Sequence, residues 1–308
     1  LRNSADLALF DEFTNNGTFT VNTEQGVSTT TLFISGGPVL LRGSGTLRLN
    51  VGDANADLND AQIVCEAGSS AVNAGTHTIA GKGLLDGDWI NNGTISADRA
   101  GQDLQITGPV DQTGGGVIRA DNAGRLLLRN AQVLGGTLDS SPDASVEIIF
   151  DNSSLDAVTN LGAFGLLSGA NAEILAGGLT NNGAITINSS AGVGSTSLLA
   201  AAPVTIDGTG TIALGVSETN ADFTDATLGN LDAQSLTLGA GQTVTGKGRL
   251  IGDIRVEGTI APGNIVVARA DVPRHNIVES QSYEVTAIYY QGIPEGSAEV
   301  QRVPVAAL

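Results

Sequence analysis

The chain has 308 residues, and its 14 Lys and Arg residues stand against 32 Asp and Glu residues, for a formal net charge of −18. Because the acids are scattered singly, they predict a solvated acidic surface that repels phosphate backbones and anionic lipid headgroups. This excludes nucleic acid and membrane surfaces as favoured partners, and no apolar run reaches the roughly 18 to 20 residues of a membrane span.

The residue composition favours thin, regularly stacked layers over one large globular core. Glycine accounts for 42 residues, aromatic residues make up only 4 %, and methionine is absent. A chain of this length needs either several domains or one elongated repeat structure to bury its apolar residues. The search for an internal repeat therefore comes before any assignment of single elements.

The chain repeats itself at a constant offset. Residues 74–95 match residues 240–260, so that Gly93 falls on Gly258, and both segments contain the motif Gly-Lys-Gly. The same offset extends upstream, where Gly43 falls on Gly208. A more divergent third copy lies between the two, and in it residues 104–121 resemble residues 32–50. We count three units, at roughly 12–90, 91–180 and 181–264.

Short apolar runs with a period of two, separated by Gly, Asn and Asp, follow one another from residue 18 onward. Such alternation in β-branched residues predicts strands with one buried face, and the Gly and Asn residues permit tight turns between them. No segment has the apolar stripe of a helix. The predicted fold is all-β: a right-handed β-solenoid, or β-helix, of tandem repeats over residues 1–264, with roughly 20 to 25 residues per coil.

The segment from Val244 to Asn264 carries a G-x-G-x-L-x-G-x-I coil followed by G-T-I-A-P-G-N. It resembles the passenger-associated repeat of autotransporter-like bacterial surface proteins. The resemblance is specific to this segment, and a weaker form recurs from Gly81 to Ile95 without the Pro-Gly-Asn turn. It implies a β-helical rod exposed outside a bacterial cell.

Residues 265–308 differ in character, because glycine thins out and all three tyrosines occur there. Alternating runs at residues 283–288 and 298–303 predict a strand-rich segment. The last coil of a solenoid leaves an open edge, which has to be covered. The segment is therefore expected either to cap its own solenoid or to add a strand to a neighbouring molecule, which would join subunits into a filament.

Clustered acids are the best candidates for chemistry, either as a calcium site or as an acid pair for glycoside hydrolysis. They are Asp53, Asp57 and Asp60, mirrored by Glu218, Asp222 and Asp225, and a second set of Asp86 and Asp88 near Lys82. Duplication argues against catalysis, because an active site is normally built once. We expect solvated loop corners, and we assign no catalytic, metal or cofactor site and no enzymatic activity.

Four single residues complete the candidates. Cys65, the only cysteine, is expected to be a buried thiol, and Trp89 falls on Ile254 in the copy, which predicts an inward position. An alignment that sets His77 opposite Thr243 predicts a surface histidine. His275 lies too far along the chain to suggest a metal site shared with His77.

These observations predict an extracellular or cell-surface structural protein, the subunit of a bacterial fibre, sheath or adhesin stalk, which self-associates into filaments. The alternative is a carbohydrate-binding or carbohydrate-cleaving β-helix, such as a lyase, a hydrolase or a phage tail fibre, with surface polysaccharide as its partner. An open groove with one unduplicated cluster of Asp, Lys or Arg would favour the alternative.

Overall fold

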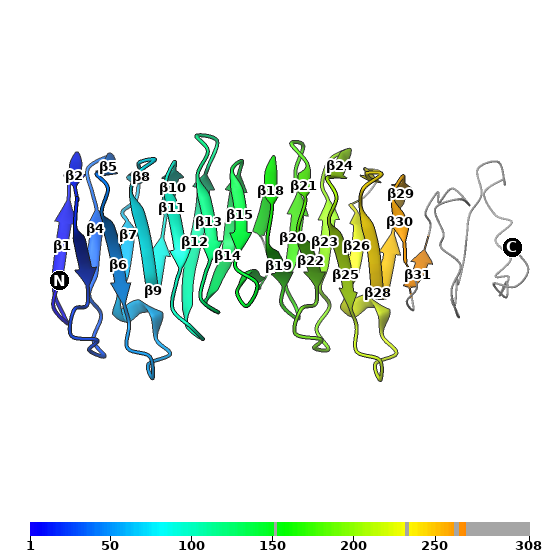
Figure 1. Ribbon diagram of the computed structural model, residues 1–308, viewed down its shortest axis with the longest axis horizontal. Coiled ribbons are helices and arrows are strands. Elements are labelled where there is room, and N and C mark those ends of the chain that lie inside the picture. The colour runs from blue at the N-terminus through cyan, green and yellow to red at the C-terminus, as the bar shows by residue number, and fades with distance from the viewer. Residues whose placement is uncertain (151–152, 232–233, 262–264, 269–308) are drawn as a thin grey trace, which may run out of the picture. The chain divides into compact units, whose positions relative to one another are not determined.

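The computed structural model describes residues 1–150, 153–231, 234–261 and 265–268. These residues form almost only short strands that pair in parallel, together with two short 3₁₀ helices (Figure 1). The chain divides into two compact units, residues 1–147 and 148–308. Each unit is described below by itself.

In the first unit, every turn of the chain contributes one strand to each of three faces, and each strand pairs in parallel with its equivalent in the next turn. The first face holds β1 (Asp6–Leu9), β4 (Thr31–Ile34), β7 (Gln62–Cys65), the end of β9 (Thr78–Asp86) and the starts of β12 (Asp103–Asp111) and β14 (Arg125–Leu134). The second face holds β2 (Glu12–Thr14), β5 (Pro38–Arg42), β8 (Ser70–Asn73), β10 (Asp88–Asn91) and the ends of β12 and β14. The third face holds β3 (Thr18–Val21), β6 (Thr46–Asn50), the start of β9, β11 (Thr94–Ala97), β13 (Val117–Ala120) and β15 (Thr137–Ser140). Strand β16 (Ser145–Ile149) lies at the boundary of the two units.

The second unit repeats this plan. Its first face holds β17 (Ser153–Asp156), β20 (Asn171–Ile174), β23 (Ser197–Ala200), β26 (Thr227–Asn230), the end of β28 (Thr243–Ile251) and β31 (Ile265–Ala268). Its second face holds β18 (Val158–Asn160), β21 (Leu179–Asn181), β24 (Val204–Asp207), β27 (Ser235–Leu238) and β29 (Asp253–Val256). Its third face holds β19 (Ala163–Leu166), β22 (Ala184–Ile187), β25 (Thr211–Gly215), the start of β28 and β30 (Thr259–Ile260).

The core of the first unit consists of stacked aliphatic side chains at the alternate positions of the strands. On the first face, the register stacks the fully buried residues Leu32, Ile63, Leu85, Ile106 and Leu128. Because side chains alternate between the two sides of a strand, every second residue of a strand such as β6 points into the interior, where Leu47 and Leu49 are both fully buried. The all-β solenoid predicted from the sequence is therefore confirmed, whereas the right hand of the coil stays a prediction.

Coil length in the first unit varies because loops are inserted at one corner. On the first face, the register partners Thr31 and Gln62 are separated by a longer stretch of chain than the partners Leu84 and Gln105. The longer coil contains the loop between β6 and β7, which protrudes beyond the strand ends and carries the 3₁₀ helix η1 (Leu58–Asp60) (Figure 1). Its equivalent, between β25 and β26, carries η2 (Phe223–Asp225).

Parallel pairing continues past Asn264, where the sequence analysis placed the end of the solenoid. Strand β31 pairs with β28, from Gly248 opposite Ile265 to Ile251 opposite Ala268. The rest of the predicted cap or subunit-joining segment, including its tyrosines and His275, lies outside the described residues.

Candidate functional site

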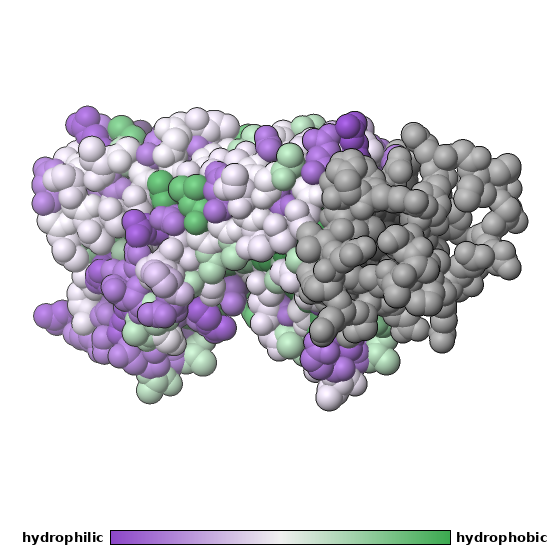
Figure 2. Space-filling view, turned by 45° about the vertical axis from the view of Figure 1, so that its right-hand side comes forward, coloured by the Kyte–Doolittle hydropathy of each residue, from purple (hydrophilic) through white to green (hydrophobic). Residues whose placement is uncertain are grey.

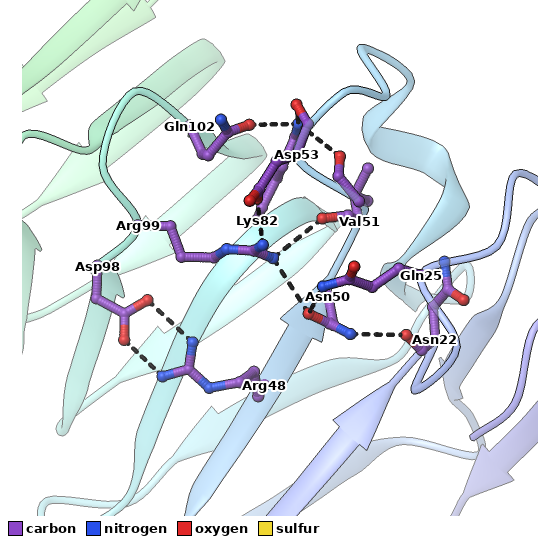
Figure 3. Close-up of polar contacts among 11 residues, drawn as sticks. Asn22, Gln25, Arg48, Asn50, Val51, Asp53, Lys82, Asp98, Arg99 and Gln102 are labelled. Atoms are coloured by element: carbon purple, nitrogen blue, oxygen red, sulfur yellow. Dashed lines mark hydrogen bonds and ion pairs between the residues drawn. The ribbon is translucent and has the colours of Figure 1, made fainter.

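Two buried lysines, one in each copy of the Gly-Lys-Gly motif, hold the protruding loops. Lys82 is only 4 % exposed, and its Nζ donates hydrogen bonds to the carbonyl oxygens of Gly52 (3.0 Å) and Asp53 (3.2 Å) and to Oε1 of Gln102 (Figure 3). Burial lowers the pKa of Lys82, and the nearby positive charge of Arg99 lowers it further. The ammonium group thus ties β9 to the loop between β6 and β7.

Lys247 repeats the arrangement in the second unit. Its Nζ donates to the carbonyl oxygens of Ser217 (3.1 Å) and Glu218 (2.9 Å), and it lies 5.6 Å from the centre of the Phe223 ring. A cation over an aromatic face adds roughly 0.5 to 2 kcal/mol of attraction. Both lysines therefore serve the local fold in the same way.

The duplicated acids form internal hydrogen bonds of these loops. Asp57 accepts from the backbone N–H of Asn59 (3.0 Å) as the N-cap of η1, and the buried Asp60 accepts from Asn55 Nδ2 (2.5 Å). In the second loop, Asp222 caps η2 and Asp225 accepts from Asn220 Nδ2 (2.5 Å). Hydrogen bonds from the side chain and backbone of Thr224 lower the pKa of Asp222.

The second predicted acid set is not brought together with its lysine. Asp86 and Asp88 flank Gly87 at the corner between the first and second faces, whereas the Lys82 ammonium points to the β6–β7 loop. Within the described ranges, no group of three or more His, Cys, Asp or Glu side chains is placed to hold a metal ion.

An interior row of amides runs along the corner between the second and third faces of the first unit. Asn73 Nδ2 donates to Asn91 Oδ1 (2.8 Å), and Asn91 Nδ2 donates to Gln112 Oε1 (3.0 Å). All three side chains are fully buried. The second unit has a similar row, in which Asn160 donates to Asn181 (2.9 Å) and Asn181 donates to Gln242 (3.0 Å). A buried amide is stable only when it is hydrogen-bonded, and stacking provides a partner in another coil: the adjacent coil for Asn73, Asn91 and Asn160, and the second coil along for Asn181.

His77 joins this interior row, so the predicted surface position is wrong. The side chain is fully buried, and Nδ1 lies 2.8 Å from Asn73 Oδ1. The offset that sets Gly93 on Gly258 pairs His77 with the buried Gln242 and not with Thr243, so the error was a shift of one position in the alignment. Burial lowers the pKa of His77.

The predicted inward position of Trp89 is confirmed, since the side chain is 1 % exposed. Cys65 is half-buried and not fully buried, because it lies at the end of β7 beneath Gly87. Its Sγ donates to the carbonyl oxygen of Asp88 (3.3 Å), and burial raises the pKa of the thiol to about 12. Such a thiol carries almost no thiolate at neutral pH and is a poor nucleophile.

A cluster of arginines and aspartates that no pattern in the sequence predicted lies beside the Lys82 loop. Arg48 forms two hydrogen bonds with Asp98, of 3.1 and 2.5 Å (Figure 3). Arg99 donates to Asn50 Oδ1 (3.1 Å) and to the carbonyl oxygen of Val51 (3.0 Å), and it also pairs with Asp53. These contacts tie the loop, the third face and the turn after β11 together.

A shallow groove of about 330 Å³ lies on the third face next to this cluster. The second ion pair at the groove joins Arg119 to Asp121 (2.6 Å), and Ser96 Oγ donates to the same carboxylate (3.2 Å). One feature of the sequence could have pointed to this cluster: the two copies differ here, because the repeat sets Ala213 opposite Arg48.

Figure 2 shows hydrophilic residues over the protruding loops of the solenoid.

In the described part of the chain, none of the helical segments has the length and apolar content needed to cross a membrane. Comparisons with protein-family models, with curated proteins and with solved structures found no match.

Proposed function

We propose that this protein is a structural repeat protein of the cell surface, the subunit of a bacterial fibre, sheath or adhesin stalk. The observation that carries the proposal is that its most elaborate buried polar contacts occur twice. Lys82 and Lys247 each bind two backbone carbonyl oxygens at equivalent positions of equivalent loops. Groups that are duplicated with their partners maintain a shape, whereas a catalytic constellation is normally present once.

The interior amide rows support the same role. They place hydrogen bonds between the coils inside each unit, where water does not compete. An unpaired buried amide would cost roughly 1 to 3 kcal/mol, so the rows penalise any slip in the register of the coils. A repeat protein under mechanical load depends on such a fixed register.

The resemblance of residues 244–264 to passenger-associated repeats supports an extracellular location, and the net charge of −18 suits a hydrated exterior. Assembly would proceed end to end, by strand addition through residues after Asn264.

Electron microscopy of the native chain in negative stain tests the proposal. We expect filaments, and we expect a chain that ends at Ala268 to remain in single particles, because it keeps β31 but lacks the joining segment. Single particles from both chains at all concentrations would reject end-to-end assembly. Filaments from both would reject the role of the C-terminal segment.

A further inference from the structure

The groove on the third face of the first unit has a simple origin in the sequence. The register aligns Arg48, Ala80, Ser96 and Arg119 on the outer side of four successive strands. Strands in a sheet are about 4.8 Å apart, so the two arginines originate roughly 14 Å from each other. The small side chains of Ala80 and Ser96 leave a hollow between them.

The charged groups at this hollow are held in place before any ligand arrives. Arg48 on β6 reaches Asp98, which follows β11, although β9 lies between these two strands. Arg119 pairs with Asp121, which also accepts from Ser96. The four charged side chains are half-buried, with 24 to 39 % of their area exposed. A carboxylate has about four acceptor positions and a guanidinium five donors, so each group retains hydrogen-bonding capacity on its exposed side.

A row of hydroxyl groups borders the hollow on its other side. The register places Thr46, Thr78 and Thr94 beside one another on β6, β9 and β11, and all three line the groove. Each threonine offers a hydroxyl group and a methyl group at the spacing of the strands. The groove therefore combines donors, acceptors and small apolar areas along a line.

The charges select the class of ligand. The positive charges of two arginines and the negative charges of two aspartates cancel at the groove. The strongly acidic chain as a whole repels polyanions. Paired Arg and Asp side chains can exchange hydrogen bonds with adjacent hydroxyl groups without a change in net charge. We propose that this groove binds a neutral oligosaccharide, held by Arg48, Asp98, Arg119 and Asp121.

The absence of a sequence copy distinguishes this site from the structural features above. The offset of the repeat sets Ala213 opposite Arg48, Gly263 opposite Asp98 and Asn264 opposite Arg99. A group that served only the repeat would be expected in both copies, as the buried lysines are. Binding at the groove does not depend on filament formation, so each proposal can fail alone.

Affinity electrophoresis in native gels tests the inference. The native chain would be run in gels that contain dextran, galactomannan, xyloglucan or the anionic polygalacturonate. We expect at least one neutral polysaccharide to retard the native chain. We also expect Asp121→Ala to weaken this retardation at least tenfold, and Ser96→Gln, which fills the hollow and adds no charge, to do the same.

Arg125→Ala is the matched control, because Arg125 forms a similar bidentate pair with Asp103 (2.9 and 2.9 Å) on the first face. It should be retarded like the native chain. Far-ultraviolet circular dichroism and thermal unfolding would verify that the variants are folded. Retardation by none of the neutral polysaccharides, retardation by polygalacturonate alone, or equal losses in Arg125→Ala and Asp121→Ala would each overturn the proposal.

Discussion

His77 is a titratable base inside the first unit, and it makes the stability of the chain depend on pH. Burial lowers its pKa in the folded state from the ordinary value of 6.5. The unfolded chain therefore binds a proton at His77 more readily than the folded chain does. The contribution of neutral His77 to stability is fully present above pH 6.5 and is lost as the pH falls through the folded pKa. At pH 5.5, one unit below the ordinary pKa, the loss in the free energy of unfolding is at most about 1.4 kcal/mol.

The first prediction concerns His77→Gln, which introduces the residue that the second copy has at this position. Urea unfolding at pH 7.5 and pH 5.5 would be measured for both chains. The native chain should lose up to about 1.4 kcal/mol more than the variant between these pH values, because glutamine does not titrate. Parallel pH profiles of the two chains would show that His77 is protonated without cost in the folded state.

The second prediction concerns the buried lysines. Lys82→Met keeps most of the side-chain volume but removes the ammonium donor from the carbonyl oxygens of Gly52 and Asp53. Of these two oxygens, that of Gly52 keeps its hydrogen bond from the backbone N–H of Asn55. The free energy of unfolding should fall by roughly 1 to 3 kcal/mol, and amide hydrogen exchange in residues 52–61 should accelerate. Lys247→Met should act in the same way on residues 217–226. Arg255→Met is the control, since that side chain is 71 % exposed; an equal effect there would contradict the anchoring role.

At the scale of the elements, the long strands β9 and β28 turn from the third face to the first at a glycine. Gly81 has a φ of +115°, and a Cβ atom at this position would overlap the carbonyl oxygen of Leu49. Gly246 has a φ of +89°, and a Cβ atom there would overlap the carbonyl oxygen of Leu214. Other residues rarely adopt this backbone conformation, and no side chain fits between the stacked strands.

The third prediction separates the cost of a positive φ in a residue other than glycine from the cost of the overlap between a Cβ atom and the adjacent strand. Gly68→Ala imposes positive φ on alanine at a site with no atom within 4 Å, and it should cost roughly 1 kcal/mol. Gly81→Ala adds the overlap with the adjacent strand and should cost at least about 2 kcal/mol, with part of the variant insoluble. Chemical unfolding of both variants measures the difference. Equal losses would mean that the coils separate easily enough to admit a methyl group.

The strands and loops could largely be predicted from the sequence, whereas the groove could not. Periodicity and the offset between the copies can be read directly along the chain, so they predicted the strands, the duplicated loops and the inward position of Trp89. Arg48 and Asp98 lie far apart in the sequence and meet only because β6, β9 and β11 lie side by side on the third face. No local pattern encodes that meeting. The wrong position of His77, in the turn between β8 and β9, shows how a shift of one position in the alignment reverses the predicted burial of a side chain.

At the scale of the whole molecule, the charge of −18 should govern association. At about 10 mM ionic strength the repulsion between acidic surfaces extends roughly 30 Å, and at about 150 mM it extends only about 8 Å. If the subunits assemble end to end, filament growth followed by light scattering should accelerate over this range of sodium chloride concentrations. A rate that is independent of salt would indicate that charge does not limit association.

Calcium provides the last test, because the duplicated acids could act through general screening or through a specific site. Asp57, Asp60, Asp222 and Asp225 already accept hydrogen bonds within their loops. Lys82 and Lys247 already donate to the carbonyl oxygens of these loops. Calcium chloride should therefore raise the thermal unfolding midpoint no more than sodium chloride at equal ionic strength. A larger rise with calcium, abolished by Asp57→Asn together with Asp222→Asn, would instead establish a metal site in the loops, since a bound ion stabilises the folded state in proportion to the logarithm of its concentration.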